Sequence, residues 1–225
     1  WPSRLRYYLP GLRKALTLAV IAPLTMTFIN MTEKQIERVK IKIEKYKKAL
    51  AADKRYWGGQ YRDGQGIRYI IPGQYIKIGD YKSGLRYFNW FAKTFPEDSG
   101  HPIFLFEWTL VLFQNNKLQD AEKKAHLTFY ANTYLFDKFL GNEPLQLDKN
   151  ESSNWDFESL VQYFHYSRKN LEFAAFADWL EGVLQSREFL DKANEFIELE
   201  RQLKNEPVGI RRTHIVNRIS KIKYG

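Results

Sequence analysis

Apolar residues in this 225-residue chain recur at helical spacing, and no stretch alternates between apolar and polar residues as a half-buried strand does. Short breaks rich in Gly, Pro, Asn and Asp separate the periodic segments. This pattern predicts an all-α fold. We expect helices at residues 32–50, 70–79, 82–95, 102–115, 118–140, 154–167, 170–184 and 187–205.

The first of these helices carries a narrow apolar seam. Its members fall three or four positions apart, at Ile36, Val39, Ile43, Tyr46 and Leu50. Thr32 and Gln35 have the spacing of a capping box, which starts a helix. Two heptads are too short for a coiled coil on their own. The seam therefore packs either against the body of this chain or against a helix of a partner.

Residues 75–96 have the spacing of a tight helical hairpin. Tyr75 lies on the first helix, Gly84 and Phe88 lie on the second, and Pro96 ends it. Only a small residue such as Gly84 fits where two helices cross closely. In these positions the segment resembles the second half of the tetratricopeptide repeat signature.

The first half of that signature matches less well. Arg68, Ile71 and Pro72 stand in place of its Trp, Leu and Gly. Because Pro is comfortable only in a first helical turn, we expect this first helix to be short. A looser copy of the repeat follows over 103–140, with Ala121 in the small-residue position.

The resemblance implies stacked antiparallel helical hairpins, with extra N-terminal helices and a basic C-terminal tail. It also implies a non-catalytic module that binds a protein or peptide partner on the concave face, which the first helix of each hairpin lines. The residues at the matching positions are Tyr69, Gly73, Ile76, Lys77, Ile103, Phe106, Leu110, Phe113 and Gln114.

The group from Ile103 to Gln114 is unusually apolar for an exposed groove. Either another helix of the chain covers it, or an apolar segment of a partner does. Residues 32–50 and 15–29 are the candidates for covering it from within.

Net charge is concentrated at the two ends of the chain. Residues 1–30 hold four bases and no acid, residues 207–225 hold five bases and no acid, and the total is +9. The tail bases are Arg211, Arg212, Arg218, Lys221 and Lys223. Ile215, Ile219 and Ile222 are spaced for a short amphipathic helix. Such a tail is either a flexible solubilising segment, or it contacts an anionic membrane, nucleic acid, or an acidic patch of its own body. Action through the basic ends, on nucleic acid or a membrane surface, is thus the alternative function.

We divide the chain into a basic and apolar leader at 1–30, a helical repeat-like domain at 31–206 and the tail at 207–225. The apolar run 15–29 is shorter than the roughly 20 residues that a spanning helix needs. The leader is sequence upstream of a start at Met31, a membrane-directed segment, or an ordinary helix on the body. We expect a cytoplasmic location, or membrane association if residues 1–30 are native.

A glycine-rich loop follows the first helix. It combines Gly58, Gly59, Gly64 and Gly66 with Arg55, Trp57, Tyr61, Arg62 and Arg68. No Lys-Ser or Lys-Thr follows these glycines, so the loop lacks the pattern of a phosphate-binding loop. Its rings and arginines either stack on single-stranded bases or fold back onto the body.

No arrangement of residues points to catalysis. The chain has no cysteine, which excludes disulfides and thiolate chemistry. His101, His126, His165 and His214 are scattered, with no pair at metal-binding spacing on a helix. The carboxylates lie on solvated helix faces among Lys and Arg. We therefore expect no enzyme activity, no metal and no cofactor.

Overall fold

The computed structural model describes residues 31–225, and the leader with its apolar run lies outside the described residues. The described chain is all-α, as expected, and residues 31–225 contain no strand. Its contacts divide it between residues 121 and 122 into two compact units, an N-terminal unit (residues 31–121) and a C-terminal unit (residues 122–225). The boundary between these units differs from the predicted boundary at 206/207, and the tail lies in the second unit.

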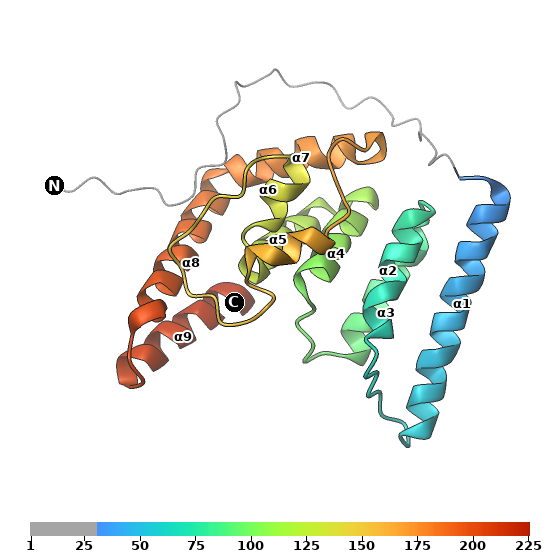
Figure 1. The fold of residues 1–225 in the computed structure, drawn as a ribbon, viewed down its shortest axis with the longest axis horizontal. Helices are drawn as coiled ribbons and strands as arrows, with labels where there is room; N and C mark the ends of the chain where they lie inside the picture. Colours follow the sequence, from blue (N-terminus) through green and yellow to red (C-terminus); the bar gives the residue numbers. More distant parts are fainter. Residues whose placement is uncertain (1–30) are drawn as a thin grey trace. The chain divides into compact units, whose positions relative to one another are not determined.

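The N-terminal unit begins with helix α1, Glu33–Tyr56. The capping box is confirmed, because Gln35 N donates to Thr32 Oγ1 over 3.3 Å and Thr32 N donates to Gln35 Oε1 over 2.8 Å. Val39, Ile43 and Leu50 are buried, and α1 packs against α2, Ile67–Lys77. The apolar seam therefore faces this chain rather than a partner helix, and Figure 1 shows α1 running beside α2.

Helix α3, Tyr81–Thr94, returns against α2, and α4, Pro102–Gln114, packs against both. Asp80 caps α3 by accepting a hydrogen bond from Ser83 N. Gly84 lies where these helices meet, since a Cβ added there would be 3.5 Å from Tyr75 Cβ on α2 and 3.4 Å from Val111 Cγ2 on α4. The expected need for a small residue at position 84 is confirmed.

Helix α4 is apolar on every face, and nine of its 13 residues are buried. The side chains of Phe106 and Leu110 have no exposed surface. A helix that is hydrophobic all round belongs in a core. The sequence left open whether this chain or a partner covers the apolar group. For Phe106 and Leu110 the cover comes from this chain.

The C-terminal unit departs most from the expected helices. Helix α5, Leu118–Ala131, ends before Asn132, and a separate helix α6 spans Leu135–Leu140. The predicted single helix over 118–140 is wrong, because the Asn132 side chain accepts from Tyr134 N and donates to the carbonyl oxygens of Trp155 and Phe157. These contacts replace continued helical hydrogen bonding.

The segment between α6 and α7 is mostly irregular. Its only described regular pieces are the short 3₁₀ helices Glu158–Tyr163 and Leu171–Phe173, so the α-helix predicted at 154–167 is wrong. Polar contacts with distant residues hold the segment in place. Asn150 N donates to the Glu200 carbonyl over 3.1 Å, and Arg168 N donates to the Phe139 carbonyl over 2.9 Å.

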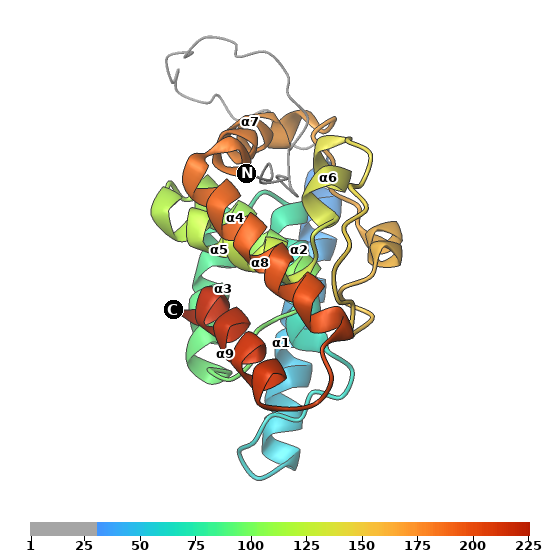
Figure 2. The ribbon, with the colours of Figure 1, turned by 90° about the vertical axis from the view of Figure 1, so that its left-hand side faces the viewer.

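Three helices complete the C-terminal unit. Helices α7, Ala174–Gln185, and α8, Arg187–Asn205, form the expected pair, and Ser186 caps α8 by accepting from Phe189 N. The tail then folds into α9, Ile210–Tyr224, which runs beside α8 (Figures 1 and 2).

We expect Gly84→Leu to lower the free energy of unfolding by about 1–3 kcal/mol, because the added side chain overpacks the meeting point of α2, α3 and α4. Gly182→Leu is the matched control, since position 182 lies in α7 and a Cβ there meets nothing within 4 Å. That control should be neutral or stabilising by up to about 1 kcal/mol, as leucine is the better helix former. Urea unfolding measures both, and equal effects would contradict the close crossing.

Candidate functional site

A groove in the N-terminal unit is the strongest candidate site. Its volume is about 410 Å³, within the range of ligand-binding pockets. Helices α1 and α3 form its walls, with contributions from α2 and the loop after α1. The lining residues are Lys47, Leu50, Ala51, Tyr61, Tyr75, Ser83, Arg86, Tyr87 and Trp90. We call this set the aromatic–basic groove.

Aromatic rings form much of this groove and contact one another. The ring centroids of Tyr87 and Trp90 are 5.1 Å apart, and those of Tyr61 and Trp90 are 6.0 Å apart in an edge-to-face arrangement. Tyr75 lies 6.4 Å from Tyr87. Contacts of this kind favour a fixed arrangement of rings. The groove therefore offers a preformed apolar surface.

The groove contains two cations and no acidic lining residue. Burial lowers the pKa of Lys47, but the Tyr75 hydroxyl and the Glu44 carboxylate outweigh this effect, so its pKa is raised and the ammonium stays charged. Lys47 Nζ lies 2.9 Å from Glu44 Oε1. Arg86 Nη2 donates to Ser83 Oγ over 2.7 Å and forms no ion pair with a described residue. Arg86 is thus placed to meet an anion.

A hydrogen bond from its hydroxyl to a backbone carbonyl of α2 fixes the Tyr87 ring. The sequence predicted that Pro72 would lie in the first turn of this helix. That prediction is wrong, because α2 begins at Ile67 and Pro72 lies inside it. Because Pro has no N–H, it cannot donate to the Arg68 carbonyl one turn earlier. The Tyr87 hydroxyl donates to that oxygen over 2.9 Å instead. Burial raises the pKa of Tyr87, so this hydroxyl keeps its proton.

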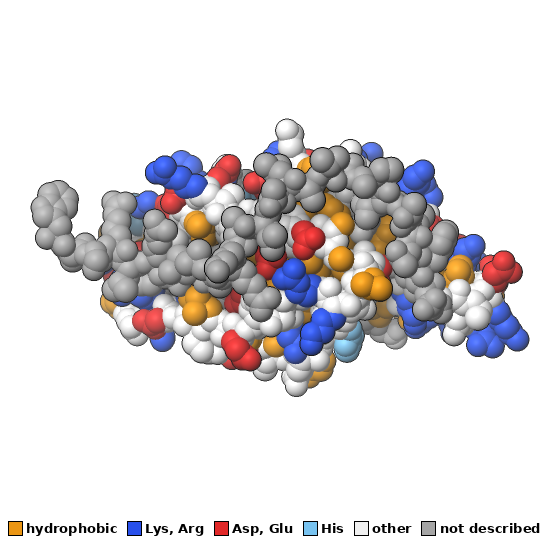
Figure 3. Space-filling model, turned by 90° about the horizontal axis from the view of Figure 1, so that it is seen from above, with side chains coloured by type: hydrophobic (Ala, Val, Ile, Leu, Met, Phe, Trp, Pro, Cys, Tyr) orange, Lys and Arg blue, Asp and Glu red, His pale blue; other side chains and the backbone are white. Residues whose placement is uncertain are grey.

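The charge of the body is divided between the two units. Residues 31–121 hold 16 Lys and Arg against 10 Asp and Glu, whereas residues 122–225 hold 15 against 16. The aromatic–basic groove therefore lies in a segment of net charge +6. On the face drawn in Figure 3, basic side chains are scattered among acidic ones rather than gathered in one patch.

The residues predicted to line a concave face do not form one open surface. Ile76, Phe106 and Leu110 are at most 2% exposed, so a partner cannot reach them, and this part of the prediction is wrong. Ile103, Phe113 and Gln114 are half-buried, and Lys77 is exposed.

Tyr69, another of these residues, is engaged within the unit. Its hydroxyl donates to Asp98 Oδ2 over 2.6 Å. Arg68 forms an ion pair with the same oxygen at 2.9 Å. This contact ties the start of α2 to the loop before α4. The sequence did not predict that Tyr75, Arg86, Tyr87 and Trp90 line one groove, because Tyr75 lies on α2 and the other three lie on α3.

Most bases of the predicted tail contact their own unit. Ile215 and Ile219 are buried against the unit, while Arg218 pairs with Glu195 at 2.6 Å and Arg211 pairs with Glu206 at 3.3 Å. Arg212 donates to the carbonyl oxygens of Leu203 and Glu206 at the end of α8. The tail is a packed helix, and an acidic part of its own body is among its partners.

The histidines do not come together. Burial lowers the pKa of both His101 and His126 to about 4. His126 stacks on Phe189. His101 lies at the start of α4, where its Nδ1 accepts a hydrogen bond from Phe104 N. His165 and His214 are exposed. No group of three His, Asp or Glu residues within 31–225 has metal-binding geometry.

A buried polar cluster in the C-terminal unit was not anticipated. Lys149 Nζ lies 2.7 Å from Glu151 Oε1, which also accepts from the Tyr134 hydroxyl over 2.6 Å. Asn150 donates to Glu200 nearby. The cavity beside them measures only about 10 Å³, which is room for no more than one water-sized molecule. The cluster therefore anchors the irregular segment rather than binding a substrate.

Comparisons with protein-family models, with curated proteins and with solved structures find no match to this chain. Within residues 31–225, no helix combines the length and the apolar character that crossing a bilayer requires. The site must accordingly be interpreted from its own geometry.

We expect Tyr87→Phe to lower the free energy of unfolding by about 1–3 kcal/mol, because the Arg68 carbonyl loses its donor. Pro72→Ala restores a backbone N–H to the same carbonyl. The cost of Tyr87→Phe should therefore shrink by about 1 kcal/mol in the Pro72→Ala background. A double-mutant cycle by urea unfolding measures this coupling, and strictly additive effects would contradict the shared acceptor.

Arg212→Ala should destabilise the protein by about 1.5–3 kcal/mol, because two carbonyl oxygens at the end of α8 lose a charged donor. Arg211→Ala removes the ion pair of a side chain that is 75% exposed, at 3.3 Å, and should cost less than about 1 kcal/mol. Thermal unfolding of the two variants distinguishes a packed tail from a loose one, for which both changes would be neutral.

Proposed function

We propose that this protein is a non-catalytic binding module that holds an acidic segment of a partner protein in the aromatic–basic groove. The observation that carries the proposal is the combination of Lys47 and Arg86 with three tyrosines and a tryptophan, without any acid, in one groove of about 410 Å³. Carboxylates of the partner pair with the two cations, and an apolar side chain packs on the rings.

The packing of the N-terminal unit supports a repeat-like scaffold as part of this proposal. Helix α2 contacts both α3 and α4, and Gly84 allows the close approach that stacked hairpins need. In this proposal the binding surface is the groove of α1 and α3 rather than the covered face of α4.

The charge of the unit favours an acidic partner over a neutral one. Residues 31–94 contain 15 Lys and Arg and six Asp and Glu, which attract an anionic segment before contact. The rings then contribute apolar burial that depends little on salt. Affinity should therefore fall as salt rises but should not vanish, because only the charged part is screened.

The test uses a fluorescent library of short peptides rich in Asp, Glu, Phe and Leu, with Gln and Asn versions of each as uncharged controls. Fluorescence anisotropy with the full chain should find acidic binders. For these, the double variant Lys47→Glu/Arg86→Glu should weaken binding about a hundredfold or more, since each of the two charged contacts contributes about 1.5–3 kcal/mol.

Lys93→Glu is the matched control, because it makes the same change on α3 at an exposed residue outside the groove. It should alter binding about twofold at most, through the long-range field alone. If Lys93→Glu and Arg86→Glu lowered the affinity for acidic peptides equally, binding would depend on the overall charge of the unit rather than on the groove. A library without any acidic binder would overturn the proposal.

A further inference from the structure

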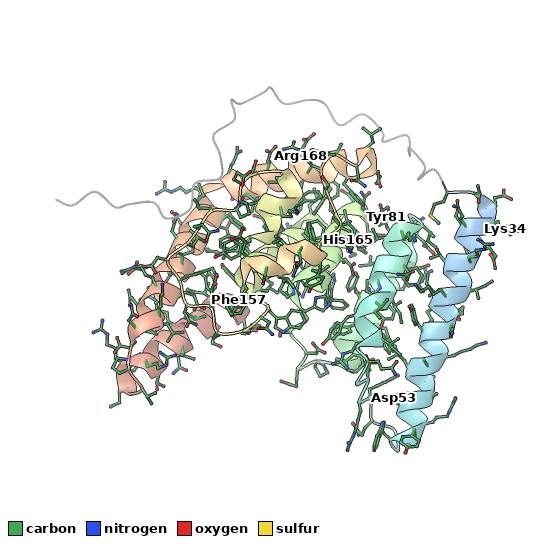
Figure 4. The ribbon with its side chains drawn as sticks, viewed as in Figure 1. Lys34, Asp53, Tyr81, Phe157, His165 and Arg168 are labelled. Carbon is green, nitrogen blue, oxygen red and sulfur yellow. The ribbon has the colours of Figure 1, made fainter. Side chains whose placement is uncertain are left out.

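The loop at the end of α1 presents aromatic rings to solvent. We call residues 54–62 the α1 tip; it follows Asp53, which Figure 4 labels near the end of α1. Tyr56 is 79% exposed and Trp57 is 40% exposed, with their ring centroids 4.9 Å apart in an edge-to-face arrangement. Of the rings in this loop, Tyr61 folds back into the groove, whereas Tyr56 and Trp57 do not.

The α1 tip is also positively charged. Lys54, Arg55 and Arg62 form no ion pair with any residue of 31–225. The guanidinium of Arg62 lies 4.1 Å from the centre of the Trp57 ring, which places a cation directly beside the exposed aromatic surface. The neighbouring carboxylate of Asp53 is occupied, because it accepts from the backbone N–H groups of Arg62 and Asp63.

Most backbone amides of the loop that ends α1 donate to acceptors close by. Trp57 N donates to the Asp53 carbonyl, Gly59 N donates to the Lys54 carbonyl over 2.8 Å, and the amides of Gly58 and Gln60 also find carbonyl partners within the loop. A loop with few unpaired amides enters a poorly hydrated layer at low cost. The same feature removes the free amides that often bind the phosphates of nucleic acids.

We propose that the α1 tip docks on the surface of an anionic lipid bilayer. Tyr and Trp rings favour the headgroup level of a membrane, where one edge is apolar and the other is wet. The three bases lie where they contact anionic headgroups. The tip extends from a helix that ends there, so its rings insert locally without the tip crossing the bilayer. Tyr56, Trp57 and the three bases lie outside the lining of the aromatic–basic groove, so this contact does not depend on the proposed function.

The experiment measures sedimentation of the full chain with vesicles of phosphatidylcholine alone or with phosphatidylglycerol added. Only the anionic vesicles should retain the protein. Tyr56→Ser/Trp57→Ser should weaken this binding about tenfold, since two interfacial rings are lost. Arg55→Gln and Arg62→Gln should each weaken it about fivefold, as expected for one base at an anionic surface. Residues 1–30 are present in every variant, so the differences report on the tip.

Matched controls lie in the C-terminal unit. Trp155→Ser removes a ring that is 51% exposed, and Arg187→Gln removes a base whose side chain is 95% exposed. Both should bind vesicles as the parent protein does. Trp57→Phe keeps an aromatic ring and should retain most of the binding, and circular dichroism checks that each variant is folded.

Three outcomes would overturn the proposal. One is equal weakening in the controls and the tip variants. A second is binding to anionic vesicles that the tip variants leave unchanged. The third is a tip that binds a labelled single-stranded oligonucleotide, but no vesicle, and loses that binding in Trp57→Ser. A variant of the groove, Arg86→Glu, separates this test from that of the proposed function, because it should weaken peptide binding about tenfold or more while lowering vesicle binding by no more than Arg55→Gln does.

Discussion

The N-terminal unit depends on a carbonyl oxygen that its own helix cannot satisfy. Pro72 leaves the Arg68 carbonyl without a donor, and a buried unpaired carbonyl would destabilise α2. The Tyr87 hydroxyl supplies the missing hydrogen bond from α3. The same contact holds the two helices in register and sets the ring of Tyr87 in the groove. A defect in one helix thereby orients a residue that the proposed site requires.

The distribution of charge matters more than its total. The net charge of +9 first suggests that the two ends carry the function, yet three tail bases contact acidic side chains or carbonyl oxygens of their own unit. What remains positive among the described residues is 31–121, above all α1, α2 and α3. Attraction of anionic partners is therefore expected at this unit, and both proposals place their ligands there.

Local signals in the sequence were sufficient for much of the fold. The capping box at Thr32, the apolar seam of α1 and the small residue at position 84 each depend on neighbours within a few turns or on one close contact, and each is confirmed. The break at Asn132 could not be foreseen, because its side chain is held by carbonyls of Trp155 and Phe157, more than 20 residues away. The burial of α4 had a visible signal, since its apolar residues cover every face rather than one stripe.

The groove and the tip combine the same residue types in opposite surroundings. In the groove the rings contact one another and Tyr87 is held by a hydrogen bond, so a ligand meets a surface that is already ordered. Little side-chain freedom is then lost on binding, which favours a specific segment of a partner. At the tip Tyr56 and Trp57 lie in solvent and their bases have no acidic partners. Such a loop binds best to an extended anionic surface that accepts its side chains in several orientations, and a lipid bilayer is such a surface. The difference between the two sites thus follows from how firmly each holds its rings rather than from their composition.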